Sequence, residues 1–403
     1  MSRYLVVAGL FILSLITYID RAAISSAKEP VAAEIGLDDQ AMGAVFSAFA
    51  LGYAAAQVPS GWFADKAGPR LMLSVVVAVW SLFTGLTGMA GTLWSLLVVR
   101  FLFGVAEAGA FPGAARAFYN WLPASELGRA NGIIFSGSRL GAALAFPLMA
   151  WLLSLGIWRL TFYILALPGL AWAALWALFF RNHPRNPPPR EQAASAAGLS
   201  FGAVLRSRPM WLAMAQYFCV NFTTFLCLSW MHPYLKQRYS LSASEAAFYT
   251  MSILLIGASA QWATGFLVDW LYRTGRQHYS RRLPAMLGFL VSAVGVAAIP
   301  LAPTAAAGAA CFAVAAFGAE MVISPSWAFC IDIGGKNSGA VSGSMNTAGN
   351  FGSFVSANAF PFLQHATGDA TAYFLLVMAM NLLSAACWMG MRTRRDSAAP
   401  ASG

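Results

Sequence analysis

The sequence has little charge for its length. Of 403 residues, 25 are Lys or Arg and 15 are Asp or Glu, which makes 10% charged, whereas soluble domains carry about 25%. Hydrophobic residues make up 59% and the mean hydropathy is +0.64. So few charges cannot keep the surface of a chain this long in water. Composition therefore excludes an ordinary cytosolic enzyme, a disordered chain and a nucleic-acid-binding module, but not a membrane enzyme.

Cysteine and histidine are also scarce, and neither forms a pattern. The five Cys lie in apolar stretches without metal-ligand or disulfide-framework spacing. The four His are scattered, and no nucleophile–base pair or nucleotide-binding loop is evident. We therefore expect no enzyme activity, no metal site and no cofactor. The residues are Cys219, Cys227, Cys311, Cys330, Cys387, His183, His232, His278 and His365.

Long apolar runs dominate the chain instead. A segment in lipid must satisfy its own backbone hydrogen bonds, so runs of about 20 apolar residues predict membrane-spanning helices. We predict an all-α membrane protein with twelve spans, at 4–24, 40–61, 70–90, 93–117, 129–153, 158–180, 210–235, 243–270, 283–301, 304–328, 338–362 and 370–391.

The basic residues orient these spans. With the N-terminus inside, only four basic residues fall in outer loops and three within spans, which leaves eighteen of the 25 inside. The positive-inside rule accounts for this bias, so the net charge of +10 needs no nucleic-acid partner. We predict a multi-pass protein of a bacterial inner membrane with both termini cytoplasmic. The outer residues are Lys28, Arg159, Lys236 and Arg238, and those within spans are Arg21, Arg100 and Arg139.

A polar stretch rich in Pro, Ala, Ser and Arg divides the chain. It covers residues 181–209, after the sixth predicted span. The sequence thus predicts an N-terminal six-helix bundle at 1–180, a cytoplasmic linker at 181–209 and a C-terminal six-helix bundle at 210–403.

A short motif recurs in the two halves. Between spans 2 and 3 the chain reads Gly61-Trp-Phe-Ala-Asp65-Lys66-Ala-Gly68-Pro-Arg70, and between spans 8 and 9 it reads Gly265-Phe-Leu-Val-Asp269, followed by Arg273, Gly275 and Arg276. Both copies follow G-x-x-x-D, then basic residues and Gly. Two copies six spans apart indicate a duplication, as in transporters built from repeats.

The first copy resembles the signature of the major facilitator superfamily, and the second its degenerate copy. The resemblance covers the whole chain and implies two pseudo-symmetric six-helix bundles that rock to give alternating access. It also implies that Gly61, Asp65, Lys66, Arg70 and Asp269 form a cytoplasmic gate. The alternative for Asp65 and Arg70 is a simple loop cap.

Ionisable residues lie inside two predicted spans. Span 1 ends in Tyr18-Ile-Asp20-Arg21, and span 4 carries Arg100 and Glu107 seven residues apart, two turns along one helix face. Charges at bilayer depth are costly and functional by default. An anion that occupies an Arg would release a carboxylate to take a proton, which could couple anion and proton. The alternative is a set of ion pairs that only lock helices together.

Three stretches narrow the resemblance to the anion:cation symporter family. They are Y-x-D-R in span 1, R-F-x-x-G-x-x-E-x-x-x-x-P in span 4, and the Gly-, Ser- and Asn-rich run from Asp332 to Asn350. This family includes sugar-acid, phthalate and tartrate permeases and the animal sialic-acid and vesicular glutamate carriers. The resemblance implies that Asp20 and Glu107 carry protons, that Arg21 holds the substrate carboxylate, and that Arg100 helps to couple the two.

Other polar residues of the predicted cavity suit a hydroxylated ligand, because amides and hydroxyls both donate and accept hydrogen bonds. For each Asn, a helix–helix hydrogen bond is an equal alternative. Span 7 carries no Arg, which favours a monocarboxylate, and the roles of Glu320 and Arg139 stay open. The candidate substrate-binding residues besides Arg21 are Tyr18, Tyr53, Gln57, Asn221, Thr224, Trp327, Ser344, Asn346 and Asn350.

The sequence thus predicts a monomeric, proton-coupled symporter that imports an organic anion, a sugar acid such as galactonate, hexuronate or glucarate. Its expected partners are this small anion and the lipid bilayer. The alternatives are an exporter of drugs or metabolites from the same superfamily and a membrane sensor that transports nothing. An exporter would need neither Arg21 nor Arg100, and a sensor would show no uphill uptake.

Overall fold

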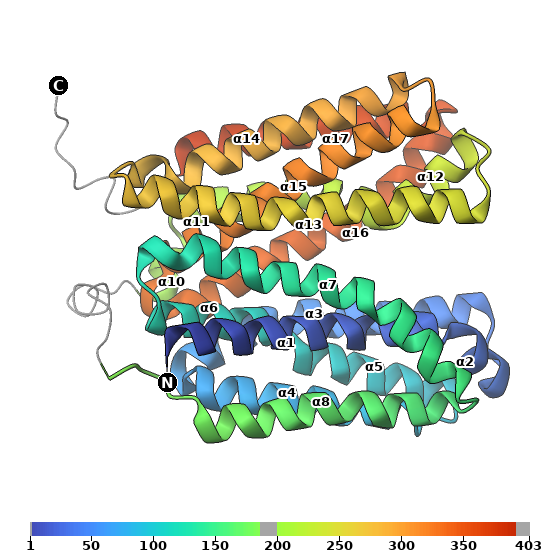
Figure 1. Ribbon diagram of the computed structural model, residues 1–403, viewed down its shortest axis with the longest axis horizontal. Coiled ribbons are helices and arrows are strands. Elements are labelled where there is room, and N and C mark those ends of the chain that lie inside the picture. The colour runs from blue at the N-terminus through green and yellow to red at the C-terminus, as the bar shows by residue number, and fades with distance from the viewer. Residues whose placement is uncertain (1, 186–199, 392–403) are drawn as a thin grey trace. The chain divides into compact units, whose positions relative to one another are not determined.

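The computed structural model describes residues 2–185 and 200–391, and within these ranges the chain is helical without a β-strand (Figure 1). The α-helices are α1 (Arg3–Ser26), α2 (Lys28–Ile35), α3 (Asp39–Ala67), α4 (Pro69–Thr87), α5 (Leu93–Glu107), α6 (Ala110–Trp121), α7 (Leu127–Ser154), α8 (Trp158–Phe179), α10 (Phe201–Leu205), α11 (Arg208–Phe225), α12 (Met231–Arg238), α13 (Ala243–Arg273), α14 (Gln277–Ala298), α15 (Ala305–Gly334), α16 (Ser338–Thr367) and α17 (Thr371–Gly390).

In the described ranges, twelve helical stretches correspond to the twelve predicted spans. In the described ranges, ten are long and apolar enough by composition, and one of these, Ala305–Thr367, contains two helices, α15 and α16. The twelfth runs from α11 into α12 through a π-helical turn at Leu226–Trp230. Expected span 4 is broken after Glu107 into α5 and α6. The signature motif, expected in a loop, is mostly helical, because α3 continues to Ala67.

The chain forms two compact units. Unit 1 contains residues 1–123, 134–198 and 334–343, and unit 2 contains residues 124–133, 199–333 and 344–403. Each unit therefore takes one short segment from the other half of the sequence. Residues 186–199 of the predicted linker lie outside the described residues, and the boundaries at 180 and 209 stay a prediction.

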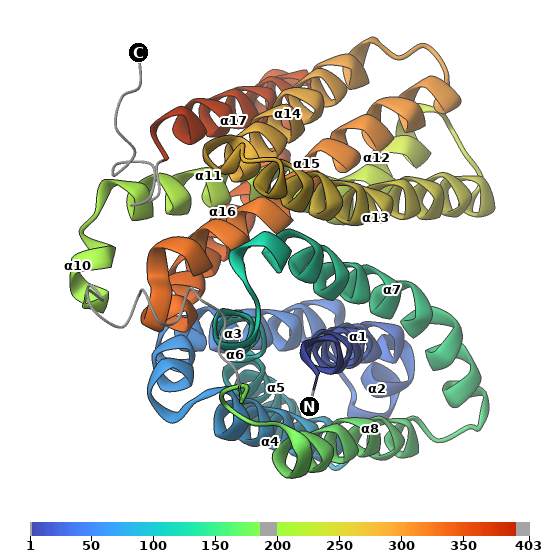
Figure 2. The same ribbon diagram turned by 60° about the vertical axis from the view of Figure 1, so that its left-hand side comes forward.

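Glycines bring α3 and α5 of unit 1 into backbone contact. A Cβ on Gly52 would lie 2.1 Å from the Phe101 carbonyl oxygen, and one on Gly104 would lie 2.2 Å from that of Phe49. The absence of a side chain at Gly52 and Gly104 thus lets the two helices approach this closely. On the other side of unit 1, α4 and α8 lie side by side (Figure 2). The α3–α5 contact positions the charged residues described next.

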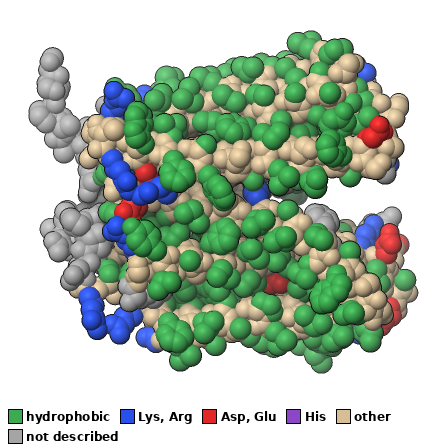
Figure 3. Space-filling view, viewed as in Figure 1, with side chains coloured by type: hydrophobic (Ala, Val, Ile, Leu, Met, Phe, Trp, Pro, Cys, Tyr) green, Lys and Arg blue, Asp and Glu red, His purple; other side chains and the backbone are tan. Residues whose placement is uncertain are grey.

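Unit 2 has an aromatic core. Trp230 stacks on Phe360 with 4.4 Å between ring centroids, and Tyr234 makes edge contacts with Phe312 and Phe374. Hydrophobic side chains also cover most of the visible face of α1 and α8 in unit 1 (Figure 3). A chain that is apolar both inside and outside is expected of a helical bundle in lipid.

Candidate functional site

A buried ion pair joins α1 to α5 in unit 1. The Arg21 Nε donates to Glu107 Oε1, and the Glu107 side chain is fully buried while about a fifth of Arg21 is exposed. The two residues are 86 positions apart. The structure thus brings together the residue expected to hold the substrate and one expected to carry protons.

Aromatic rings surround the Arg21 guanidinium. Its Cζ lies 4.5 Å from the ring centroid of Tyr53, 4.9 Å from that of Tyr18 and 5.4 Å from that of Phe49. The Phe49 ring is also 5.1 Å from the Arg100 Cζ, so one ring contacts both cations. Sequence reasoning missed Phe49, although its position one turn before Tyr53 on α3 could have indicated it.

Asp20 belongs to the same cluster. Its side chain is almost fully buried, and its Oδ2 accepts a hydrogen bond of 3.2 Å from the Trp80 indole of α4. Arg100, also buried, interacts electrostatically with both Asp20 and Glu107. No sequence signal pointed to Trp80, because only the tertiary structure brings its N–H to a carboxylate 60 positions away.

The cluster carries buried polar atoms that make no hydrogen bond to any residue that the structure describes. Each is a donor or an acceptor of the kind that a carboxylate, a hydroxyl or a proton could use. Gln57, one turn after Tyr53 on α3, has neither its amide oxygen nor its nitrogen bonded. The atoms are Asp20 Oδ1, Arg21 Nη2, Gln57 Oε1 and Nε2, Arg100 Nε and Glu107 Oε2.

In unit 2 the predicted ligand-binding amides bond within their own surroundings. Asn221 donates to the Tyr217 carbonyl at 2.7 Å and accepts from Ser353 at 3.2 Å. The Asn350 amide donates to the Asn346 carbonyl at 2.9 Å. Of these bonds, only the one from Ser353 of α16 to Asn221 of α11 is a helix–helix hydrogen bond, whereas the other two are made within a single helix.

The other unit 2 residues lie on three helices. The buried Trp327 of α15 donates to the Tyr217 hydroxyl at 2.9 Å, which makes Tyr217 a neighbour that the sequence did not indicate. Thr224 of α11 bonds to its own helix at the Val220 carbonyl, and Ser344 is buried on α16. The structure thus places the predicted residues in two clusters, one in each unit.

The first signature motif holds the start of α16 within unit 1. Asp65 Oδ1 and Oδ2 accept hydrogen bonds of 2.9 and 2.8 Å from the backbone N–H groups of Gly339 and Ala340. A carboxylate at a helix N-terminus is stabilised by the helix dipole. Gly61 permits the approach, because a Cβ there would lie 2.3 Å from the Gly339 oxygen. Arg116 Nε, absent from the predicted set, is 3.9 Å from Asp65.

The basic residues of this motif have other contacts. Lys66 lies over the Trp62 ring, 3.9 Å from its centroid. Arg70 Nε and Nη2 donate to the Ala177 carbonyl near the end of α8 at 2.8 and 2.6 Å. Arg70 therefore ties α4 to α8, and Gly68 makes the turn between α3 and α4 with a φ of +82°.

The second copy repeats this geometry within unit 2. Asp269 accepts from the N–H groups of Gly128 and Arg129, at 2.8 and 3.1 Å, at the start of α7. It also pairs with Arg129 Nε at 2.8 Å. The repeat extends four residues upstream to Gln57 and Gln261, where Gln261 donates to Glu320 at 2.5 Å. Arg139 lies half-buried on α7.

A family model described as the Major Facilitator Superfamily matches residues 10–357. The chain belongs to this superfamily. Two solved structures share its fold with 15% sequence identity: the proton:xylose symporter XylE, with a TM-score of 0.74 over 98% of each chain, and the transporter FucP in the outward conformation, with a TM-score of 0.76 over 98% of this chain and 100% of that one.

Its relatives are transporters of organic acids. The chain is 32% identical to a probable sulfoacetate transporter of Cupriavidus necator, over 93% of this chain and 90% of that protein. It is 29% identical to a probable L-galactonate transporter of Escherichia coli, over 92% and 84%, and 28% identical to a hexuronate transporter of Bacillus subtilis, over 92% and 90%. The chain is thus a membrane transporter with organic-acid permeases among its relatives, and not an enzyme.

Proposed function

We propose that this transporter is a proton-coupled symporter that imports an organic anion, a sugar acid such as galactonate, hexuronate or glucarate, by alternating access. The observation that carries the proposal is the ion pair between Arg21 and Glu107. In this pair the buried charge of Glu107 is neutralised by Arg21, so a ligand that binds Arg21 would also change the environment of Glu107.

A substrate carboxylate would compete with Glu107 for Arg21. The planar guanidinium can hold a carboxylate through two parallel hydrogen bonds, and Arg21 Nη2 is a buried donor without a hydrogen-bond partner among the described residues. Once the substrate takes this cation, Glu107 loses its counter-charge in a buried position. Neutralisation by a proton is then favoured, because an unpaired buried carboxylate is costly.

Asp20 and Arg100 would complete the coupling. Arg100 interacts electrostatically with both Asp20 and Glu107. When a proton neutralises one of these carboxylates, the positive charge of Arg100 would stabilise mainly the other. Trp80 holds Asp20 through a single N–H. In this mechanism the proton is the coupling ion, and Glu107 and Asp20 carry it in turn.

Asp65 and Asp269 would act as gates. Each holds two backbone N–H groups at the start of a helix, so its contacts must break when that helix start moves away during alternating access. We place this carrier in a bacterial inner membrane as a monomer with both termini cytoplasmic.

The test is uptake into proteoliposomes. Purified protein is given radiolabelled D-galactonate, a hexuronate and D-glucarate, with and without an inward proton gradient, and counterflow is measured in parallel. We expect one sugar acid to accumulate only with the gradient. Counterflow without any gradient-driven accumulation would overturn proton coupling, and no transport of any member of the panel would overturn the substrate class.

A second candidate substrate is a short sulfonate-bearing acid such as sulfoacetate. A named relative with this substrate is 32% identical over 93% of this chain. In addition, the amide nitrogens of Asn221 and Asn350 already bond within the protein, which leaves fewer donors for sugar hydroxyls. Sulfoacetate therefore belongs in the same panel, and its transport in place of the sugar acids would decide for this candidate.

A further inference from the structure

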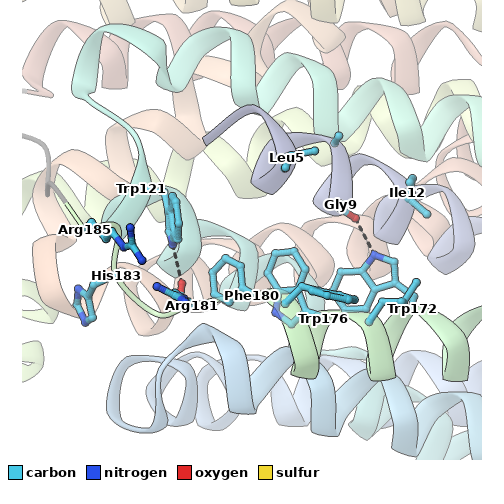
Figure 4. A pocket seen from close by; sticks show the side chains of 13 residues that line it. Leu5, Gly9, Ile12, Trp121, Trp172, Trp176, Phe180, Arg181, His183 and Arg185 are labelled. Atoms are coloured by element: carbon cyan, nitrogen blue, oxygen red, sulfur yellow. Dashed lines mark hydrogen bonds between the residues drawn. The ribbon is translucent and has the colours of Figure 1, made fainter. Parts of the chain in front are cut away.

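A groove on unit 1 lies away from the charged cluster. It has a volume of about 760 Å³ and runs between α1, α8 and the end of α6. Its floor is a row of aromatic rings: Trp172, Trp176 and Phe180 stack with centroids 4.7 and 4.0 Å apart, and Trp121 lies 5.7 Å from Phe180 (Figure 4). Ligand pockets of proteins are typically about 300–1,000 Å³, so the groove is large enough to hold a molecule.

The walls of this groove favour an apolar occupant. Leu5, Ile12, Leu175 and Phe179 are exposed along its edges, so the groove opens at the surface where a spanning helix meets lipid. The Gly9 carbonyl, which lies within it, already accepts a hydrogen bond of 2.8 Å from the Trp172 indole. A hydrocarbon chain can therefore fill the groove without leaving this carbonyl unsatisfied.

One end of the groove is basic. Arg181, His183 and Arg185 gather there beside Trp121, at the opposite end from Ile12 and Trp172 (Figure 4). In the described part of the chain, neither the Arg181 nor the Arg185 guanidinium pairs with a carboxylate. Both side chains are exposed just after the end of α8, the level at which a span reaches the lipid headgroups.

The backbone that carries this basic end is fixed to its neighbours. The Trp121 indole donates to the Arg181 carbonyl, and the Asn120 amide donates to the Asn182 carbonyl, both at 2.8 Å. The Asn182 side chain in turn accepts from the Arg70 N–H at 2.8 Å. The cations thus stand at a defined place beside the apolar groove, which lowers the entropic cost of binding.

We propose that this groove binds an anionic phospholipid of the inner leaflet, with an acyl chain along the aromatic floor and the phosphate on Arg181 and Arg185. The apolar floor and the paired cations at one end match the two parts of such a lipid. A zwitterionic lipid offers the same chain but no net charge, so the site should discriminate by headgroup.

Native mass spectrometry of the full-length protein in detergent tests the proposal. Phosphatidylglycerol is titrated against phosphatidylcholine with the same acyl chains. Each basic residue near a membrane surface contributes about 1 kcal/mol toward anionic lipid. Arg181→Gln with Arg185→Gln should therefore weaken phosphatidylglycerol binding about 30-fold and leave phosphatidylcholine unchanged. The matched control is Arg206→Gln with Arg208→Gln, two exposed basic residues of unit 2, which should retain wild-type binding.

A second variant separates the chain from the headgroup. Ala8→Phe places a ring in the groove and leaves both cations in place, so it should weaken the binding of both lipids. Equal losses in the two double variants, or equal affinity of the wild type for both lipids, would overturn the proposal. So would tight binding of inorganic phosphate that Ala8→Phe does not change, because the site would then be a simple anion site.

Discussion

At the residue scale, the main feature of this transporter is an arginine that contacts both aromatic rings and a buried carboxylate. Arg21 contacts the rings of Tyr18, Phe49 and Tyr53 and pairs with Glu107. Cation–π contacts are worth about 0.5–2 kcal/mol each, and more when desolvated. In the proposed mechanism they would hold the guanidinium in place while its carboxylate partner changes from Glu107 to the substrate.

Arg21→Lys tests the need for a planar guanidinium. Lys keeps the charge, but it loses the fork and most of the stacking. Charged hydrogen bonds contribute about 1.5–3 kcal/mol each, so we expect substrate affinity to fall about 10- to 100-fold, measured by calorimetry on the purified protein. Arg159→Lys, the same change at the Glu34 pair of unit 1, is the control and should bind normally. Near-normal affinity in Arg21→Lys would remove Arg21 from the site.

Glu107→Gln tests proton coupling. Gln mimics the protonated carboxyl, so binding and counterflow should persist while accumulation under a pH gradient is lost. Wild-type uptake should rise as the external pH falls, and this dependence should flatten in the variant. Proteoliposome uptake at several external pH values measures both effects, and Glu34→Gln should behave as wild type.

Asp20→Asn should also abolish accumulation, measured in the same assay. Counterflow should also slow in this variant if Arg21, which would lose a compensating charge, holds the substrate too tightly.

If Glu107→Gln still concentrates substrate, the proton travels by another residue. Glu320, hydrogen-bonded to Gln261, is then the next to replace.

At the scale of elements, glycines decide which helices can touch. In both copies of the signature motif, a Gly one turn before the Asp lies against the backbone of another Gly, Gly61 against Gly339 and Gly265 against Gly128. These contacts let each Asp reach two N–H groups at a helix start. A larger residue would hold the backbones apart and weaken the hydrogen bonds.

Asp65→Asn should weaken the contact with the start of α16. The variant loses the negative charge and one acceptor oxygen, so the state in which this contact is made should become about tenfold or more less favourable. Cysteine accessibility on the two sides of the membrane would then shift toward the inward-facing state. Asp38→Asn, which removes a carboxylate from the exposed N-terminus of α3, serves as the control. An unchanged accessibility pattern in Asp65→Asn would make Asp65 a simple helix-end residue.

Gly104→Ala should disturb the charged cluster without touching a charge. The added Cβ would meet the Phe49 carbonyl at 2.2 Å, and overpacking of this kind costs about 1–3 kcal/mol. We expect a lower Tm and about tenfold weaker substrate binding. Gly43→Ala on α3 has nothing within 4 Å and should leave both unchanged or raise the Tm, because Ala favours helix over Gly. Equal behaviour of the two variants would contradict the close α3–α5 packing.

At the scale of the whole molecule, the few charges fall into two groups. One group lies in the loops and orients the chain in the membrane, and the other is buried within the spans. Most basic residues fall in the loops that the positive-inside rule assigns to the cytoplasm. Four of the charges within the spans of unit 1, Asp20, Arg21, Arg100 and Glu107, gather in one cluster, where oppositely charged partners lower the cost of burial.

Reporter fusions test the orientation. A fluorescent protein fused after residue 403 should fluoresce, and alkaline phosphatase fused there should be inactive, because both termini are expected in the cytoplasm. Phosphatase inserted after Gly91, in the predicted outer loop between spans 3 and 4, should be active. The reverse pattern would invert the topology.

Much of the fold could be predicted from the sequence, because lipid imposes a strong length requirement. Runs of about 20 apolar residues can only be helices there, so the twelve spans follow from hydropathy. The break after Glu107 was harder to predict, because a Gly and a Pro inside an apolar run are tolerated in many membrane helices. The helical extension of α3 through Asp65 was equally hidden, since polar residues at a span end fit both a helix and a loop.

The candidate site could be predicted only in part. Charges within apolar segments identified Asp20, Arg21, Arg100 and Glu107 directly, because such residues are too costly to lack a role. The sequence cannot show that Arg21 pairs with Glu107, since the two lie 86 positions apart. Nor could it identify Trp80, because aromatic residues are common throughout this chain, which has 29 Phe and 14 Trp.

The sequence by itself determined that the chain is a helical membrane protein with a duplicated motif and a few buried charges, since these follow from hydropathy, spacing and the cost of charge in lipid. Only the tertiary structure decided which carboxylate holds Arg21, which helix starts Asp65 and Asp269 hold, and that Arg70 ties α4 to α8. The physical reason is that partner choice depends on distances between helices, which small residues and backbone contacts set and which no local pattern encodes.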